Sequence, residues 1–212
     1  MTNKSDVEIF VDSDEKHIQI NDLDISDIEK VWEQLLVSYP GFVADFCFTN
    51  TLASEKFLLG MGAQVLENSM IMRLAEKDFV EMATASHVEL VTKANFDSFA
   101  AYHDSTNPEM YWSSARLLAD FDSWDIFTVQ RNSEIAGYAL LRDSRELYCV
   151  IADSVEDKIA LASAAARKNF AAKADDLTFW VDRDNFTERG AASHLGFRHE
   201  GYRISYRVEV AP

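Results

Sequence analysis

Apolar residues in the second half of the chain change repeatedly between the spacing of a strand and that of a helix. Alternating or β-branched runs predict strands, and apolar residues repeated every three or four positions predict amphipathic helices. These patterns predict, in order, a strand (87–92), two helices (94–105 and 110–121), a hairpin (125–143), a strand (145–153), a helix (154–174), a strand (175–182), a helix (185–196) and a final strand (198–210). Because strands separated by helices imply parallel neighbours and the hairpin is antiparallel, we expect a mixed sheet.

The first half of the chain shows a shorter version of the same order. Its pattern predicts strands (7–11 and 16–20) around the turn DSDE, a helix (24–36), a strand (44–48), a helix (53–62) and a closing strand (65–74). Aligned from Met61 and Leu195, the two closing segments share Gly62 with Gly196 and Arg73 with Arg207. We therefore expect a tandem protein with a truncated unit (1–78), a linker (79–86) and a complete unit (87–212).

The composition is that of an ordinary globular protein. Hydrophobic residues make up 48% of the chain, with three Pro and seven Gly, so core material is sufficient and disorder is disfavoured. Cys47 and Cys149 lie inside apolar runs, which favours buried reduced thiols over a disulfide. Because no apolar run approaches roughly 18 residues and the first residues lack a secretory segment, we expect a cytoplasmic protein.

The charge balance limits the classes of partner. Lys and Arg number 20 against 36 Asp and Glu, which gives a net charge of −16. This charge repels phosphate backbones, so nucleic acids and anionic membranes are disfavoured as partners, whereas a cationic substrate would be attracted. Solubility alone also explains the acidity.

The sequence also disfavours several classes of enzyme. The five histidines are scattered, no HExxH or paired-cysteine spacing occurs, and there is no GxSxG or GK[ST] motif. These absences disfavour a metal site, a serine hydrolase and a nucleotide kinase.

The segment NFTERGAASHLGF (185–197) resembles a helix motif of the GNAT superfamily of N-acetyltransferases. In that motif an Asn is followed eleven residues later by the Gly of a Leu-Gly-Phe end, here Asn185 and Gly196. Its position between a strand and a long final strand is also that of the family. The resemblance implies a GNAT-like acyl-CoA N-acyltransferase fold of the α+β class, with a mixed, mainly antiparallel sheet flanked by helices. It further implies direct acyl transfer, with acetyl-CoA as co-substrate and an amine of a small molecule or peptide as acceptor.

The same resemblance implies where the cofactor would bind. In GNAT proteins the strand equivalent to 145–153 splays from its neighbour, and its free backbone groups hold the pantetheine arm. The positions implied in the cofactor site are Cys149, Val150, Ile151, Ser154, Asn185 and Ala192. Two of them have a structural explanation as well, because Ser154 with Asp157 resembles a capping box and Asn185 is a plain N-cap.

Two departures from the family pattern affect the chemistry. The family normally has a glycine-containing phosphate loop before the helix that begins at Ser154, but this chain has ADSVEDK. Glu156 and Asp157 suit the helix dipole and would oppose a bound pyrophosphate. Many family members also carry a Tyr acid four residues before the motif glycine, and Ala192 occupies that position here.

The candidate site residues each have a structural alternative. Glu146, as a base through water, and His194, as a proton carrier near neutral pH, are the catalytic candidates, although an exposed strand-edge carboxylate and a helix-end histidine need no such role. The aromatic residues around the turn DSTNPEM are candidates for an acceptor cleft or for helix packing: Tyr102, His103, Tyr111 and Trp112.

Two functions from different classes remain open. The first is an acyl-CoA-dependent N-acyltransferase. The alternative is a catalytically degenerate GNAT-fold protein that binds a small molecule or a protein partner, which the missing glycine loop and tyrosine favour. Because the truncated unit lacks its opening strand and helices, we expect its sheet to need the complete unit or a second copy, as in a homodimer.

Overall fold

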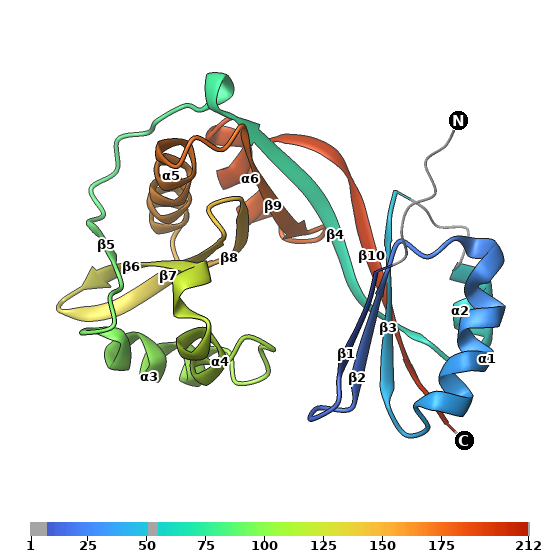
Figure 1. Ribbon diagram of the computed structural model, residues 1–212. Coiled ribbons are helices and arrows are strands. Elements are labelled where there is room, and N and C mark those ends of the chain that lie inside the picture. The colour runs from blue at the N-terminus through green and yellow to red at the C-terminus, as the bar shows by residue number, and fades with distance from the viewer. Residues whose placement is uncertain (1–7, 51–54, 212) are drawn as a thin grey trace. The chain divides into compact units, whose positions relative to one another are not determined.

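The computed structural model describes residues 8–50 and 55–211 (Figure 1). The chain divides into two compact units, which we call unit 1 (residues 1–70 and 201–212) and unit 2 (residues 71–200). Two long strands, β4 (Gln64–Ala75) and β10 (Arg198–Glu209), belong to both units: one end of each strand lies in unit 1 and the other end in unit 2.

Unit 1 is a sheet with two helices. Its sheet order is β1-β2-β3-β10-β4, in which β1 and β2 are antiparallel, β2 and β3 parallel, and β3 and β10 antiparallel. The other elements are β1 (Glu8–Asp12), β2 (His17–Asn21), the 3-10 turn η1 (Ile25–Asp27), α1 (Ile28–Ser38), β3 (Val43–Thr49) and α2 (Glu55–Gly60).

The strands of unit 1 bury one face against α1 and α2, which lie on the same side of the sheet (Figure 1). Alternate residues of β3 point into this core, as the period of two requires, and Phe46 and Phe48 are almost completely buried there. They pack with Ile18 and Ile20 of β2 and with Leu35 of α1. The apolar alternation read from the sequence therefore identifies the core face of this sheet.

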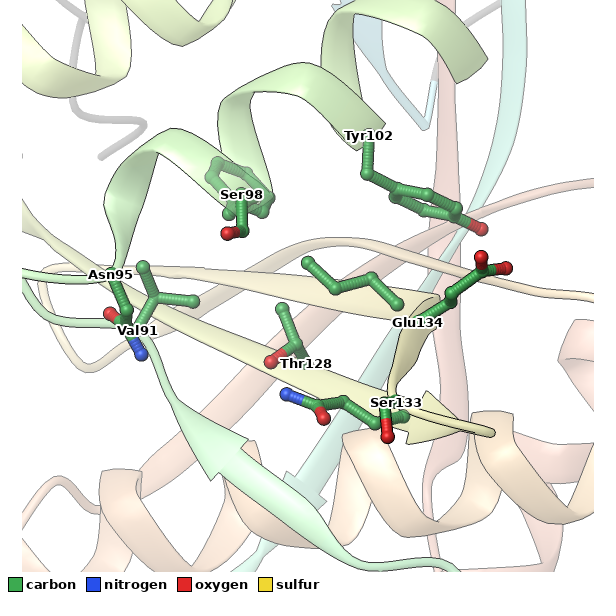
Figure 2. A pocket seen from close by; sticks show the side chains of 10 residues that line it. Val91, Asn95, Ser98, Tyr102, Thr128, Ser133 and Glu134 are labelled. Carbon is green, nitrogen blue, oxygen red and sulfur yellow. The ribbon is translucent and has the colours of Figure 1, made fainter.

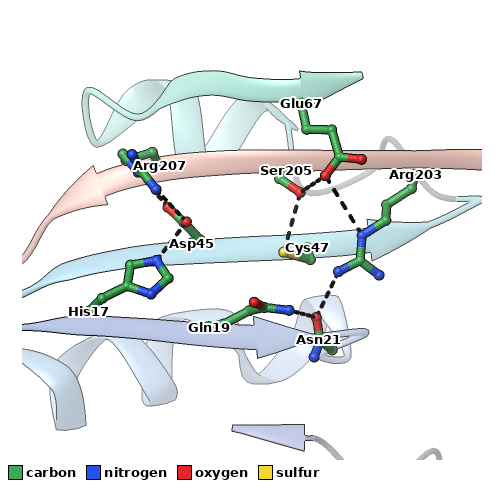
Figure 3. A network of polar contacts seen from close by, with 9 residues as sticks. All are labelled: His17, Gln19, Asn21, Asp45, Cys47, Glu67, Arg203, Ser205 and Arg207. Carbon is green, nitrogen blue, oxygen red and sulfur yellow. Dashed lines mark hydrogen bonds and ion pairs between the residues drawn. The ribbon is translucent and has the colours of Figure 1, made fainter. Parts of the chain in front are cut away.

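The opposite face of the same strands carries a network of polar side chains (Figure 3). Asp45 is 5% exposed, and its carboxylate accepts hydrogen bonds from Arg207 Nε and Nη2 at 2.8 and 2.7 Å. His17 Nε2 lies 2.7 Å from the same carboxylate. Burial acts to raise the pKa of Asp45, but the hydrogen bonds and charges of Arg207 and His17 outweigh it and lower that pKa.

Replacing Arg207 by alanine should lower the free energy of unfolding by about 2 kcal/mol, since Asp45 would keep only one strong partner. The expected cost is below that of a fully buried pair because the Arg207 side chain is 46% exposed. Urea unfolding of Arg207→Ala measures it. Arg198→Ala, which removes a 73% exposed partner of Asp78, is the control and should cost less than about 0.5 kcal/mol. Equal costs for the two variants would contradict the prediction.

Unit 2 is a mixed sheet with helices on both faces. Its order is β4-β9-β8-β7-β6-β5; the pairs from β5 to β8 are antiparallel, and β8 pairs with β9 in parallel. Besides the 3-10 turns η2 (Glu76–Asp78) and η3 (Phe121–Ser123), its elements are β5 (Val88–Leu90), α3 (Phe96–Thr106), α4 (Ser114–Ala119), β6 (Trp124–Arg131), β7 (Glu134–Arg142), β8 (Glu146–Ala152), α5 (Val155–Ala171), β9 (Asp176–Asp182) and α6 (Phe186–His194).

The expected class, a mixed and mainly antiparallel sheet flanked by helices, is confirmed. In unit 2, α3 and α4 lie on one side of β6, β7 and β8, and α5 lies on the other (Figure 1). Both cysteines are free thiols, Cys47 buried and Cys149 partly buried. Among the described residues no helix is both long and apolar enough to cross a membrane, and no three His, Cys, Asp or Glu side chains gather as metal ligands would.

The two compact units consist of other residues than the expected truncated and complete units, whose bounds stay predictions. Residues 71–78 lie in unit 2, and residues 201–212 lie in unit 1. The reason is the length of the last strand, because residues 203–209 of β10 pair with β3 in unit 1. The expected helix over 110–121 is also shorter, and only Ser114–Ala119 is α-helical.

Candidate functional site

The two parallel strands β8 and β9 of unit 2 pair only at their beginning. Glu146 is in register with Thr178 and Leu147 with Phe179, and the Thr178 N–H donates to the Arg145 carbonyl at 3.0 Å. In the described part of the chain no later residue of β8 is in register with β9. The two strands therefore separate after Leu147, as the resemblance implied for this position.

A bulge in β8 marks the point of separation. Against β7, Leu147 pairs with Leu141 and Cys149 with Leu140, so Tyr148 is an extra residue on β8. Such a bulge bends a strand and increases its twist. Residues 149–152 of β8 are therefore not paired with β9, and this part of the strand is a free backbone edge. The predicted pantetheine positions lie on this edge: Cys149, Val150 and Ile151. Val150 is buried, and the other two are partly buried.

The helix α6 begins with a reciprocal pair of hydrogen bonds. The Glu188 N–H donates to Asn185 Oδ1 at 3.1 Å, and Asn185 Nδ2 donates to Glu188 Oε2 at 3.0 Å. Asn185 is therefore a side-chain N-cap, and its amide also holds the Glu188 carboxylate; the Asn185 backbone N–H donates to the Asp182 carbonyl, so the arrangement is not a full capping box. The side-chain cap confirms the N-cap interpretation of Asn185, whose contact with CoA stays a prediction.

Glu188 is a partly buried carboxyl group at the edge of β8. Burial raises its pKa from the ordinary 4.5 to about 6; the charge of Lys158 acts against this shift and that of Asp182 adds to it. The charge of Glu188 also acts on Cys149. Burial is the main cause that raises the pKa of the Cys149 thiol, and the negative charge of Glu188 raises it further. Glu188 therefore lies among side chains of α5, β9 and β8, where the strands separate. Glu188 was not among the residues predicted from the sequence, although the spacing Asn-x-x-Glu could have indicated its contact with the N-cap residue.

The N-terminus of α5, where the family holds pyrophosphate, is occupied by the chain's own side chains. Ser154 Oγ accepts from the Asp157 N–H at 3.1 Å, which confirms the predicted cap. Asp157 is 2% exposed, and its carboxylate accepts from Ser86 Oγ at 2.6 Å and pairs with Arg131 Nη2 at 2.8 Å. Glu156 Oε1 accepts from the Ala85 N–H at 2.9 Å.

These contacts determine how well the helix end fits a phosphate. The first turn of α5 already holds two carboxylates at the positive end of the helix dipole. Residues 85 and 86 lie against them, and the Arg131 guanidinium at this helix end is paired with Asp157. The described residues at the start of α5 therefore do not fit the pyrophosphate of an acyl donor, and the pantetheine position at β8 stays a prediction.

The predicted catalytic residues lie on different elements. Glu146 is the first residue of β8, partly buried and in register with Arg142 and Thr178. His194 is the last residue of α6 and is exposed; its Nδ1 donates to the Gly190 carbonyl at 2.7 Å. Ala192 is 2% exposed and offers no polar side-chain group.

The predicted acceptor residues divide into buried and exposed ones. His103 has no exposed surface; its Nε2 lies 2.8 Å from the Trp112 carbonyl and its Nδ1 2.8 Å from Tyr138 Oη. Because a carbonyl only accepts, Nε2 carries the proton in a neutral ring, and Nδ1 accepts from the Tyr138 hydroxyl. Asn107 Nδ2 donates to Tyr138 Oη, which completes the network. An acceptor therefore cannot contact His103 in this conformation, and its role here is structural.

The other three aromatic residues have different surroundings. The Trp112 ring packs edge-on against Trp124 with the centroids 5.0 Å apart. Tyr111 is 42% exposed, and the Arg116 guanidinium lies 4.0 Å from its ring centroid. Tyr102 is partly buried and lines a cavity beside α3. Of the four predicted acceptor residues, only Tyr102 lines this cavity.

Comparisons with known proteins support the fold. No protein-family model and no curated protein sequence matches the chain. Among solved structures, a GCN5-related N-acetyltransferase from Sphaerobacter thermophilus matches with a TM-score of 0.66 and 10% identity, over 97% of this chain and 76% of that one. A functionally unknown protein from Staphylococcus epidermidis matches with a TM-score of 0.66 and 12% identity, over 99% and 93%.

A tandem GNAT protein from the clavulanic acid biosynthesis pathway also matches. Its TM-score is 0.62 at 10% identity, and the match covers 97% of this chain and 79% of that one. Likeness at such low identity shows the fold and not the activity. The chain therefore has the fold of the GCN5-related N-acetyltransferases, the GNAT superfamily, as the helix motif at 185–197 indicated.

Proposed function

We propose that the chain is an acyl-CoA-dependent N-acyltransferase in which the free edge of β8 holds the pantetheine arm of the acyl donor. The observation that carries this proposal is the separation of β8 from β9 after Leu147. A backbone edge without a strand partner offers N–H and C=O groups to the amides of pantetheine, as a sheet edge does to an added strand. The acyl-CoA would supply the acyl group as a thioester.

The residues around this edge suggest how transfer proceeds. In direct transfer the N–C bond forms and the C–S bond breaks, the nitrogen of the neutral amine loses one proton, and the sulfur leaves as a thiolate that takes up a proton from water. Because the pKa of Glu188 is about 6, its carboxylate is mostly ionised at pH 7 and can accept that proton. Backbone N–H groups of β8 would polarise the thioester carbonyl. The acceptor is a small-molecule or peptide amine, which the net charge of −16 attracts.

A second candidate function rests on a different observation. Asp157 and Glu156 fill the end of α5 that would hold pyrophosphate, and Ala192 stands where the family often has a tyrosine acid. These features favour a catalytically degenerate protein that keeps the fold and binds a small molecule or a protein partner.

Titration calorimetry with acetyl-CoA and with S-acetylpantetheine, which lacks the pyrophosphate, separates the two functions. Because α5 offers no phosphate site, we expect both compounds to bind with dissociation constants within about threefold of each other. Thiol release from either donor with a panel of amines then tests transfer. Acetyl-CoA binding more than about thirtyfold tighter would contradict the closed helix end. Absence of saturable binding by both at millimolar concentration would reject the transferase and leave the second candidate.

A further inference from the structure

A cavity of about 450 Å³ lies between α3 and the β6–β7 hairpin in unit 2 (Figure 2). No residue of β8 lines it, so its walls are not those of the proposed acyl-donor site. Its apolar surface comes from Val91, Phe99 and Ile135. A volume of this order is typical of cavities that bind small molecules.

Polar groups of the lining are placed to hold one end of a ligand. Figure 2 shows the Tyr102 hydroxyl and the Glu134 carboxylate turned toward each other at one end of the cavity. Thr128 lies in the wall of the cavity and is 3% exposed.

The charge of the lining is negative. Glu134 is the only charged residue among the ten described residues that line the cavity. Over residues 8–50 and 55–211 its carboxylate forms neither an ion pair nor a hydrogen bond. A second carboxylate, that of Glu89, contacts a lining residue from outside the cavity. Its Oε2 accepts a hydrogen bond from Nε2 of the lining residue Gln130 at 3.1 Å. Glu134 is itself exposed, so a ligand can reach its carboxylate, and a positively charged ligand complements this lining best.

We propose that this cavity binds a small organic ammonium ion with a short apolar chain, at a site separate from that of the acyl donor. The ammonium group pairs with the Glu134 carboxylate and donates to the Tyr102 hydroxyl beside it. The apolar chain lies against Ile135 and Val91. The inference does not require acyl transfer, because none of its contacts belongs to the edge of β8.

The test compares three probes of equal length, n-butylammonium, n-butanol and butyrate, by titration followed in ¹H–¹⁵N NMR spectra. We expect saturable shifts on α3 and the hairpin with butylammonium, binding at least tenfold weaker with butanol, and no saturation with butyrate. Equal affinity for butylammonium and butanol, or shifts located elsewhere, would overturn the proposal.

Matched variants separate this site from a general attraction to an acidic protein. Glu134→Gln keeps the shape and removes the charge, so it should weaken butylammonium binding at least tenfold. Ser98→Trp fills the cavity and should abolish binding, with folding checked by the thermal unfolding midpoint. Glu109→Gln removes an exposed carboxylate outside the lining and should leave binding unchanged. Unaltered affinity in Glu134→Gln would refute the site, as would an equal loss in Glu109→Gln.

Discussion

Replacing Gly196 by alanine should lower the free energy of unfolding by about 3 kcal/mol, the largest stability effect that we expect from a single methyl group in this chain. Gly196 has φ of +97°, a conformation that costs residues with a Cβ about 1–3 kcal/mol. An added Cβ would also overlap the Asp78 carbonyl oxygen and lie 3.3 Å from Leu74 Cδ1. Urea unfolding followed by circular dichroism measures the loss.

The position of Gly196 explains why the chain requires this conformation. The Phe197 N–H donates to the Ala192 carbonyl and the Gly196 N–H to the Ser193 carbonyl, both at 3.1 Å. These two bonds form a Schellman motif, which ends a helix through a left-handed residue. The Leu-Gly-Phe end is therefore a helix stop first, whatever ligand the helix contacts.

Gly190 provides the matched control for Gly196. It lies inside α6, and an added Cβ would have no heavy atom within 4 Å. Gly190→Ala should raise stability by about 0.5–1 kcal/mol, because alanine favours a helix over glycine. A loss below about 1 kcal/mol in Gly196→Ala would show that neither the backbone conformation nor the close approach to Asp78 is needed.

Features decided by neighbouring residues could be predicted from the sequence. The caps of α5 and α6 follow from Ser154 and Asn185, each of which accepts from the N–H three residues later. The order of strands and helices follows from local apolar spacing, and the hairpin follows from its polar turn. Each of these signals lies within a few residues of the structure that it specifies.

Features that depend on distant pairing could not be predicted in the same way. Arg207 and Asp45 are 162 residues apart in the chain, and Asp157 meets Ser86 across 71 residues. The separation of β8 from β9 was an implication of the family resemblance, because no pattern within either strand shows where their pairing ends. The burial of Glu188 and His103 likewise depends on elements that the local pattern does not bring together.

Replacing Glu188 by glutamine should make the protein more stable than the wild type at pH 8 and should strongly lower the proposed acyl-transfer activity. The folded pKa of Glu188, about 6, lies above the ordinary 4.5, so the ionised carboxylate destabilises the folded protein. Protonated Glu188 contributes to the stability of the folded protein. This contribution is fully present below pH 4.5 and is lost as the pH rises through about 6. The two pKa values differ by an amount that corresponds to about 2 kcal/mol. Glutamine can still accept the Asn185 Nδ2 hydrogen bond.

We therefore expect Glu188→Gln to exceed the wild type by up to about 2 kcal/mol at pH 8 and to equal it near pH 4. Urea unfolding at both pH values measures this difference, and it does so whether or not the protein is an enzyme. A constant difference across this range would contradict the raised pKa of Glu188.

In the proposed acyl transfer, Glu188 is the base that accepts the proton of the amine. Loss of a general base typically costs about 10²–10⁴ in rate, so Glu188→Gln should lower kcat/KM at least a hundredfold. The wild-type rate should rise with pH through an apparent pKa of about 6. Asp182→Asn removes a charge that raises the pKa of Glu188, and Lys158→Gln removes one that lowers it. These variants should shift the profile in opposite directions, toward lower and higher pH, while a purely structural Glu188 would leave it unmoved. If Glu188→Gln keeps its rate and Glu146→Gln or His194→Gln loses it, the proton acceptor is the residue so identified, and the hydrogen bond from Asn185 Nδ2 remains the only role of the Glu188 carboxylate.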